Sequence, residues 1–246
     1  EITFSIYVED GAGIVQLALL HQSGWNLVGL PLEVENSHYL NLFPDAIEGT
    51  LFTFGASYEP ETTLAPGEGY WLRFSDQGMN ELSGIELTSV TIALNENLNL
   101  ISGITNETSI YSIGDPNNII IPGTFYAFNE SYEQTEILEP GKGYWVRSTS
   151  AGSINIGSGR LGKIITPFAS TLNNANIISI NGAELYFGVD IPEEKILNYS
   201  LPPKPPTGAF DVRFTGDWKY CSSAGVIEVM NTGVPLEVEF NVRDEE

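Results

Sequence analysis

The chain has 246 residues, of which 32 are acidic and 10 basic, giving a formal net charge of −22. Its apolar content of 42% is too high for a disordered acidic tail. No apolar run approaches the ~20 residues that span a bilayer. The charge argues against nucleic acid, whose phosphates need clustered Lys and Arg, and against anionic membrane surfaces. We therefore expect a folded acidic protein with no nucleic-acid partner and no membrane insertion.

The chain opens on a strand-like segment. Residues 2–8 (I-T-F-S-I-Y-V) alternate apolar and polar side chains, and residues 9–13 (E-D-G-A-G) follow as a turn. The two together resemble the last strand and turn of an immunoglobulin-like domain. We assign residues 1–20 to the end of such a preceding domain or to a leading strand. A start within a strand indicates a processed chain or a fragment of a longer protein.

An internal repeat is the strongest signal in the sequence. Residues 49–73 align with residues 123–147 at a constant offset of 74, and 13 of the 25 positions are identical. Upstream, Trp25–Val28 aligns with Leu98–Ile101 at an offset of 73. We expect the two copies to pack as one pseudo-symmetric body, because a unit of this size is only marginally stable alone. The boundaries that we assign to the two units are 21–78 and 79–152.

Each unit has the pattern of short β-strands. The stretch Trp25–Leu32 is apolar, and Leu51–Phe54 and Tyr70–Phe74 are short runs rich in aromatic residues. Pro66-Gly67 predicts a turn before the last of these runs. The one helical suggestion is Tyr39–Glu48, where apolar residues recur at helix-like spacing. Because no long amphipathic helix is present, we predict an all-β fold of two tandem pseudo-symmetric β repeats and a C-terminal domain.

Residues 153–246 form this C-terminal β domain, which we expect to resemble an antiparallel β-sandwich. It contains the proline-rich segment 201–208 (L-P-P-K-P-P-T-G), which cannot form a helix or an interior strand and is extended. The segment is either an inter-domain linker or a rigid strap packed on the preceding domain. Three alternating runs after it predict strands of one antiparallel sheet with a wet, acidic face: Phe210–Phe214, Val226–Met230 and Leu236–Val242.

Two of these patterns carry a family resemblance. The units share G-W-N-L-V…G-T-L-F-x-F…L-x-P-G-x-G-Y-W, and residues 182–214 contain G-A-E-L-Y-F-G and L-P-P-K-P-P-T-G-A-F-D-V-R-F. The first resembles a repeat of large secreted and cell-surface bacterial proteins, many exported by type IX secretion. The second resembles the region just upstream of their C-terminal sorting domain. The resemblance implies an extracellular, non-catalytic region that follows an enzymatic or adhesive domain. The chain departs from the family in ending at Glu246 without a basic C-terminal end.

The doubled aromatic–arginine motif supplies the candidate ligand-binding residues. In an extended strand Trp71 and Arg73 share one face, and Tyr70 and Leu72 share the other. Either Trp71 stacks under the Arg73 guanidinium above a core that holds Tyr70 and Leu72, or the tryptophans are stacking platforms for sugar rings. A contact with a protein partner is a third reading. The candidate residues are Tyr70, Trp71, Arg73, Tyr144, Trp145 and Arg147.

Signals for catalysis are weak. Glycoside hydrolysis needs two carboxylates about 5–10 Å apart across a cleft. Candidate pairs precede each Pro-Gly turn, but an acidic chain places carboxylates near each other by chance. The only histidines, His21 and His38, lack metal-ligand spacing, so we expect both at the surface. We expect no cofactor, and the sequence leaves metal binding open. The carboxylate pairs are Glu59 with Glu61 and Glu133 with Glu136.

These observations favour a non-catalytic accessory, spacer or anchoring module of a secreted or surface-displayed bacterial protein. Its partners would be other domains of the same parent protein or a polysaccharide. The alternative is a carbohydrate-binding module that uses the Tyr-Trp-x-Arg strands, and a glycoside hydrolase is a remote third. A spacer should bury Trp71 and Trp145, whereas a glycan binder should expose at least one of them.

Overall fold

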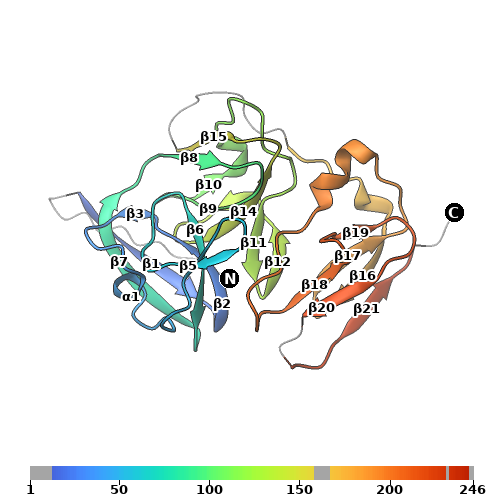
Figure 1. Ribbon diagram of the computed structural model, residues 1–246, viewed down its shortest axis with the longest axis horizontal. Helices are drawn as coiled ribbons and strands as arrows, with labels where there is room; N and C mark the ends of the chain where they lie inside the picture. The colour runs from blue at the N-terminus through green and yellow to red at the C-terminus, as the bar shows by residue number, and fades with distance from the viewer. Residues whose placement is uncertain (1–12, 158–166, 231–232, 244–246) are drawn as a thin grey trace.

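The computed structural model describes residues 13–157, 167–230 and 233–243 (Figure 1). The predicted all-β class is confirmed, with 46% of the residues in strands and 8% in helices. The helix expected over Tyr39–Glu48 is a single turn, α1 (Tyr39–Leu42). It ends at Phe43 because Pro44 disfavours the helical conformation in the residue before it.

The first unit consists of a three-stranded and a four-stranded antiparallel sheet. In the three-stranded sheet, of order β1-β7-β3, the central strand pairs with both neighbours. In the four-stranded sheet, of order β2-β6-β4-β5, β6 pairs along its whole length with β2. The strands are β1 (Ile14–His21), β2 (Gly24–Gly29), β3 (Leu32–Glu33), β4 (Phe52–Phe54), β5 (Tyr58–Pro60), β6 (Gly69–Phe74) and β7 (Gly78–Glu86).

The second unit has a four-stranded sheet with the equivalent order, β9-β14-β11-β12. Its pairings match those of the first unit position by position, since Phe52 pairs with Trp71 and Tyr126 pairs with Trp145. Two further pairs complete the unit, β8 with β15 and β10 with β13. The elements are β8 (Val90–Leu94), β9 (Asn97–Ser102), β10 (Thr108–Ser109), η1 (Ile110–Ser112), β11 (Tyr126–Asn129), β12 (Ser131–Gln134), β13 (Ile137–Leu138), β14 (Gly143–Ser148) and β15 (Gly152–Ile156).

Strand pairing places the unit boundary later in the chain than residue 78. β1 and β7 pair over eight residues, from Ile14↔Ile85 to His21↔Gly78, and both strands add side chains to the core of the first unit. β8 and β15 make the corresponding pair in the second unit. The first unit therefore extends from β1 through β7, and residues 14–20 belong to it. Residues 1–12 lie outside the described part.

The two units meet through reciprocal backbone contacts. The Gly29 N–H donates to the Gly141 carbonyl at 2.9 Å, and the Ser102 N–H donates to the Gly67 carbonyl at 3.0 Å. These pairs occupy equivalent positions of the repeat. Gly69 lies so close to the second unit that a Cβ there would fall 2.5 Å from the Ile101 carbonyl oxygen. A Cβ at Gly143 would fall 2.9 Å from the Val28 carbonyl oxygen of the first unit, so glycine suits both positions.

The C-terminal unit contains two further sheets. One has the order β19-β17-β16-β21, in which β17 and β19 are parallel and the other pairs antiparallel, and the second pairs β18 with β20. Side chains from both sheets share one core, centred on Ile178, Leu185, Val212 and Phe214. The elements are η2 (Leu172–Asn174), β16 (Asn176–Ile180), β17 (Ala183–Phe187), η3 (Glu193–Tyr199), β18 (Asp211–Phe214), β19 (Tyr220–Cys221), β20 (Ile227–Met230) and β21 (Val238–Asn241).

The expectation of one sheet from the last three alternating runs is wrong. β18 pairs with β20, but β21 pairs with β16 in the other sheet. All four residues of β18 are buried, including Asp211 and Arg213, so this strand has no wet acidic face. Alternation predicts a two-faced strand but not its partner, because the same pattern suits either sheet of a sandwich.

We predict that Gly69→Ala and Gly143→Ala each destabilise the protein by about 1–3 kcal/mol, because the added methyl group meets backbone of the other unit. Urea unfolding measures the change. Gly55→Ala is the matched control, since its Cβ would lie 3.6 Å from the Glu59 carboxylate, an ordinary contact. Equal stability of all three variants would contradict the tight packing between units.

Candidate functional site

The two tryptophans of the repeated motif lie at the contact between the units. Both have 0% of their surface exposed. The Trp71 ring lies 4.7 Å from Phe128 of the second unit, at an interplanar angle of 77°. The Trp145 ring lies 4.7 Å from Phe54 of the first unit, at 79°. The two pairs occupy equivalent positions of the repeat. Each unit therefore packs its tryptophan against the equivalent phenylalanine of the other unit.

A tyrosine of each unit extends this aromatic cluster. Tyr132 lies 6.4 Å from Trp71, and Tyr58 lies 6.5 Å from Trp145, both in tilted, edge-on orientations. Edge-to-face pairs at such distances stabilise beyond the area they bury. The cluster therefore joins the two units, as the two halves of a symmetric interface do.

This burial changes the interpretation of the motif. A sugar ring needs an exposed aromatic face on which to stack, and neither Trp71 nor Trp145 offers one. The predicted alternative, in which sugar rings stack on these tryptophans, is not compatible with their buried positions. Their role here is contact between the units.

The tyrosines of the motif point into the cores of their own units. Tyr70 belongs to the first core and Tyr144 to the second, as the strand alternation predicted for Tyr70. The Tyr70 hydroxyl accepts from the Ala65 N–H at 3.0 Å, and the Tyr144 hydroxyl accepts from the Glu139 N–H at 2.6 Å. Burial raises the pKa of both phenols. Each tyrosine thus fixes the Pro-Gly turn that precedes it.

The arginines of the motif differ between the units. Arg73 is exposed, and its guanidinium lies 5.9 Å from the Trp25 ring, its cross-strand neighbour, so the expected stacking on Trp71 is wrong. In the second unit Leu98 takes the place of Trp25 opposite Arg147. The Arg147 side chain is half-buried and donates to the Asn97 amide oxygen at 3.3 Å. Burial lowers the pKa of Arg147.

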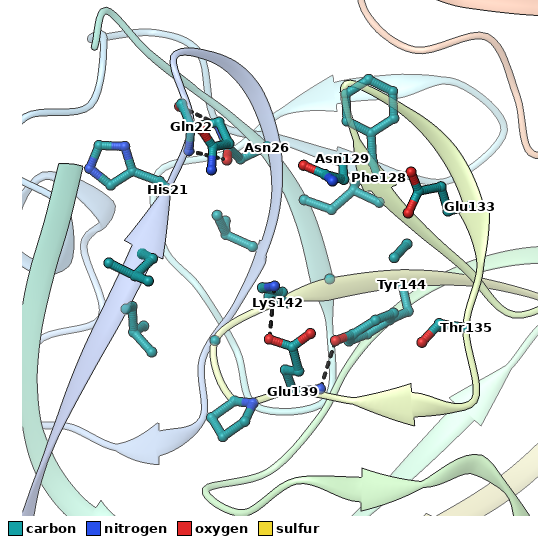
Figure 2. A pocket seen from close by; sticks show the side chains of 18 of the residues that line it. His21, Gln22, Asn26, Phe128, Asn129, Glu133, Thr135, Glu139, Lys142 and Tyr144 are labelled. Atoms are coloured by element: carbon teal, nitrogen blue, oxygen red, sulfur yellow. Dashed lines mark hydrogen bonds and ion pairs between the residues drawn. The ribbon is translucent and has the colours of Figure 1, made fainter. Parts of the chain in front are cut away.

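A groove of about 280 Å³ lies between the segment that runs from β1 into β2 and the second unit. Figure 2 shows Gln22 and Asn26 on one rim and Asn129 and Glu133 on the other. At its base Lys142 forms an ion pair with Glu139 at 2.8 Å. The lining thus combines amides, carboxylates and one ammonium group. Such a set can hydrogen-bond a small polar molecule.

The remaining titratable candidates have structural partners. His21 is buried rather than at the surface, stacks on Phe74 and pairs with Asp45 at 3.0 Å. His38 caps α1 by accepting from the Leu40 N–H. Of the predicted carboxylate pairs, Glu61 accepts from its neighbour's backbone N–H and Glu136 from the Tyr111 hydroxyl, while Glu59 and Glu133 are exposed. In the described ranges no group of three His, Cys, Asp or Glu residues is placed to hold a metal ion.

The proline-rich segment 201–208 crosses the aromatic cluster as a strap, one of the two alternatives left by the sequence. Leu201 is buried in the cluster itself. The Tyr132 hydroxyl donates to the Pro203 carbonyl at 2.7 Å, and the Tyr58 hydroxyl donates to the Lys204 carbonyl at 2.9 Å. The two equivalent tyrosines therefore hold consecutive residues of the strap, as aromatic-lined grooves hold polyproline segments.

Two further contacts fix the ends of the strap. The Trp25 indole donates to the Thr207 carbonyl at 3.1 Å. Arg213, fully buried, donates to the Pro202 carbonyl at 2.8 Å and to both carboxylate oxygens of Asp211. Its second carboxylate partner is Asp217 at 2.7 Å. The buried guanidinium thus connects the strap to β18, and the strap connects the C-terminal unit to the repeats.

Tyr58, Tyr132 and Arg213 were not among the predicted site residues. A signal existed for the two tyrosines, since they are identical between the units although they stand beside a variable loop. Arg213 is the one cation in the apolar run F-D-V-R-F, where a buried charge needs carboxylates nearby.

We predict that Trp145→Ala and Phe54→Ala are coupled. The tryptophan truncation should cost about 3–5 kcal/mol of unfolding free energy, because it leaves a cavity between the units. The double variant should cost less than the sum by about 1 kcal/mol, the value of the edge-to-face contact. Urea unfolding of the full cycle measures this. Trp145→Ala with Leu20→Ala, an exposed residue of β1, should be additive.

We also predict that the strap loosens in alkali. Burial raises the pKa of Tyr58 to about 12 from its ordinary value of 10.0 and also raises the pKa of Tyr132 well above that ordinary value. The folded state therefore holds these protons more tightly than the unfolded chain, so stability is full below pH 10 and falls as pH rises toward 12. An ionised phenol also cannot donate to the strap carbonyls.

The measurement compares the protein with Tyr58→Phe/Tyr132→Phe. At neutral pH the double variant should lose about 1 kcal/mol per hydroxyl, and cleavage within 201–208 by a protease of broad specificity should accelerate. The difference between the two proteins in unfolding free energy and in cleavage rate should shrink as pH rises. Tyr111→Phe, which loses a hydrogen bond to Glu136 rather than to the strap, should leave cleavage of the strap unchanged. A difference that does not change with pH would contradict the role of the two tyrosine hydroxyls as donors to the strap.

Comparisons with known proteins identify no relative of this chain. No protein-family model, no curated protein and no solved structure matches the chain. In the described ranges no helix is long and apolar enough to cross a bilayer.

Proposed function

We propose that this chain is a rigid, non-catalytic spacer or anchoring module of a secreted or surface-displayed bacterial protein. The observation that carries the proposal is the strap, which bonds to both repeat units and to the buried Arg213 of the C-terminal unit. These contacts make one mechanical body of three units. Such a body suits the task of holding another domain at a fixed distance and orientation.

The chemistry of the repeated motif supports the same proposal. The Tyr-Trp pairs that are identical between the units are used for packing: the tryptophans join the units, and Tyr70 and Tyr144 fix turns. A repeat maintained for stacking on a ligand would direct at least one of these aromatic side chains to the surface. The extracellular or cell-surface location rests on the resemblance to type IX secretion proteins.

The groove of Figure 2 favours a second candidate, carbohydrate binding. The observation is its position between units, with the amides of Gln22 and Asn129 on its opposite rims. Amides are groups that can hydrogen-bond sugar hydroxyls. A panel of soluble polysaccharides tests this candidate. Binding lost in Asn129→Ala/Lys142→Ala, with the fold intact, would replace the spacer by a glycan-binding function.

We predict that rigidity depends on Asp211. Asp211→Asn should cost about 3–5 kcal/mol, because it removes the buried carboxylate that compensates Arg213. Asp217→Asn removes a carboxylate from the same guanidinium, but one that is half exposed, and should cost less than about 1 kcal/mol. Unfolding free energies separate the two variants.

Small-angle scattering then tests the function. The protein should scatter as one rigid particle with the dimensions of Figure 1, and Asp217→Asn should scatter identically. Asp211→Asn, under conditions where each unit stays folded, should give a larger maximum dimension. Scattering of the unmodified protein that requires a mixture of unit orientations would contradict the rigid spacer.

A further inference from the structure

The outermost strand of the C-terminal unit, β21, has an open edge. It pairs with β16 on one side and ends the sheet in the described ranges, and in Figure 1 it lies at the lower right, away from the repeat units. An open edge of this kind presents unpaired backbone donors and acceptors to other chains.

The core-facing side chains of β21 are uncovered. Phe240 stands opposite Ile178 and Val238 opposite Ile180, two buried residues of the unit's core. Cross-strand neighbours share a face, so Phe240 and Val238 point to that same core face. Even so, Phe240 is 66% exposed and Val238 45%, and Val242, next on this face, is 63% exposed. Such a row of exposed apolar side chains marks an interaction surface.

The backbone of these same three residues faces the open edge. The Asn181 N–H donates to the Glu237 carbonyl, so Glu237 directs its backbone groups toward β16. Backbone direction alternates along an antiparallel strand. Val238, Phe240 and Val242 therefore direct their N–H and C=O groups outward, where an added strand would bond them.

The segment 237–243 is complementary to itself in the antiparallel direction. Centred on Phe240, it places Phe240 opposite Phe240 of the second copy, Val238 opposite Val242, and Glu237 opposite Arg243. All outward-facing backbone groups then meet outward-facing groups. We propose that two copies of this chain associate through β21, joining their C-terminal sheets into one continuous sheet across a two-fold axis.

Charge selects this register over the one centred on Glu239. A shift that centres the pair on Glu239 sets that carboxylate against its own copy, and like charges directly opposite each other are destabilising. The register centred on Phe240 instead forms the Glu237–Arg243 pair twice. Because the contact uses the same strand of both copies, it closes at two and does not propagate into a fibre.

The net charge of −22 sets the conditions for the experiment. Two such chains repel at long range, and the repulsion is screened beyond about 8 Å at physiological salt. Sedimentation equilibrium of the full chain over a concentration series at that salt should show a monomer–dimer equilibrium with no higher species. A chain that stays monomeric up to its solubility limit would overturn the proposal.

Phe240→Lys tests the position of the contact. It places two ammonium groups against each other at the two-fold axis and should weaken association at least about tenfold. The exposure of Phe240 means that the fold should survive, which circular dichroism checks. Leu20→Lys is the matched control, a comparably exposed apolar residue on the first unit, and should associate like the unmodified protein. Equal weakening by both variants would move the contact away from β21.

A charge exchange tests the register independently of the core. Glu237→Arg and Arg243→Glu each create two like-charge pairs and should weaken association, whereas Glu237→Arg/Arg243→Glu should restore it. Both residues are exposed, so the fold is not at risk. Failure of the double variant to recover affinity would exclude the register centred on Phe240.

Discussion

The reciprocal insertion of Trp71 against Phe128 and Trp145 against Phe54 is the contact on which the rest of the structure depends. A single unit has a core of its own, but its four-stranded sheet would leave one indole in water. Pairing the units buries both indoles at once. The two glycines of the motif permit it, because any larger residue at Gly69 or Gly143 would keep the backbones apart.

The strap builds on that contact. Its carbonyls can bond Tyr58 and Tyr132 at once only when the units hold these hydroxyls side by side, so the binding surface exists only in the assembled pair. The polyproline segment loses little backbone entropy on docking, since its prolines restrict it beforehand. Arg213 then joins the docked strap to β18 in a site where removing one partner leaves a buried charge.

Local patterns predicted what depends on local geometry. Alternation in G-Y-W-L-R correctly placed Tyr70 and Leu72 in the core, because the side-chain period of a strand is two. It could not say whether the face of Trp71 meets water, a sugar or another unit, since all three tolerate the same residues. Nor could it pair Arg73 with Trp25, which depends on cross-strand register. The same limit explains β21, whose pattern fits either sheet of a sandwich.

A departure from the symmetry of the repeats gives the strap its direction. Tyr58 and Tyr132 are equivalent, so by themselves they would accept a polyproline segment in either direction across the pseudo-two-fold axis. Trp25 favours one direction, because its indole donates to the Thr207 carbonyl. The equivalent residue of the second unit is Leu98, whose side chain has no donor. The strap therefore ends over the first unit. That direction brings the chain to β18, where Arg213 donates to the Pro202 carbonyl and so joins the C-terminal unit to the strap.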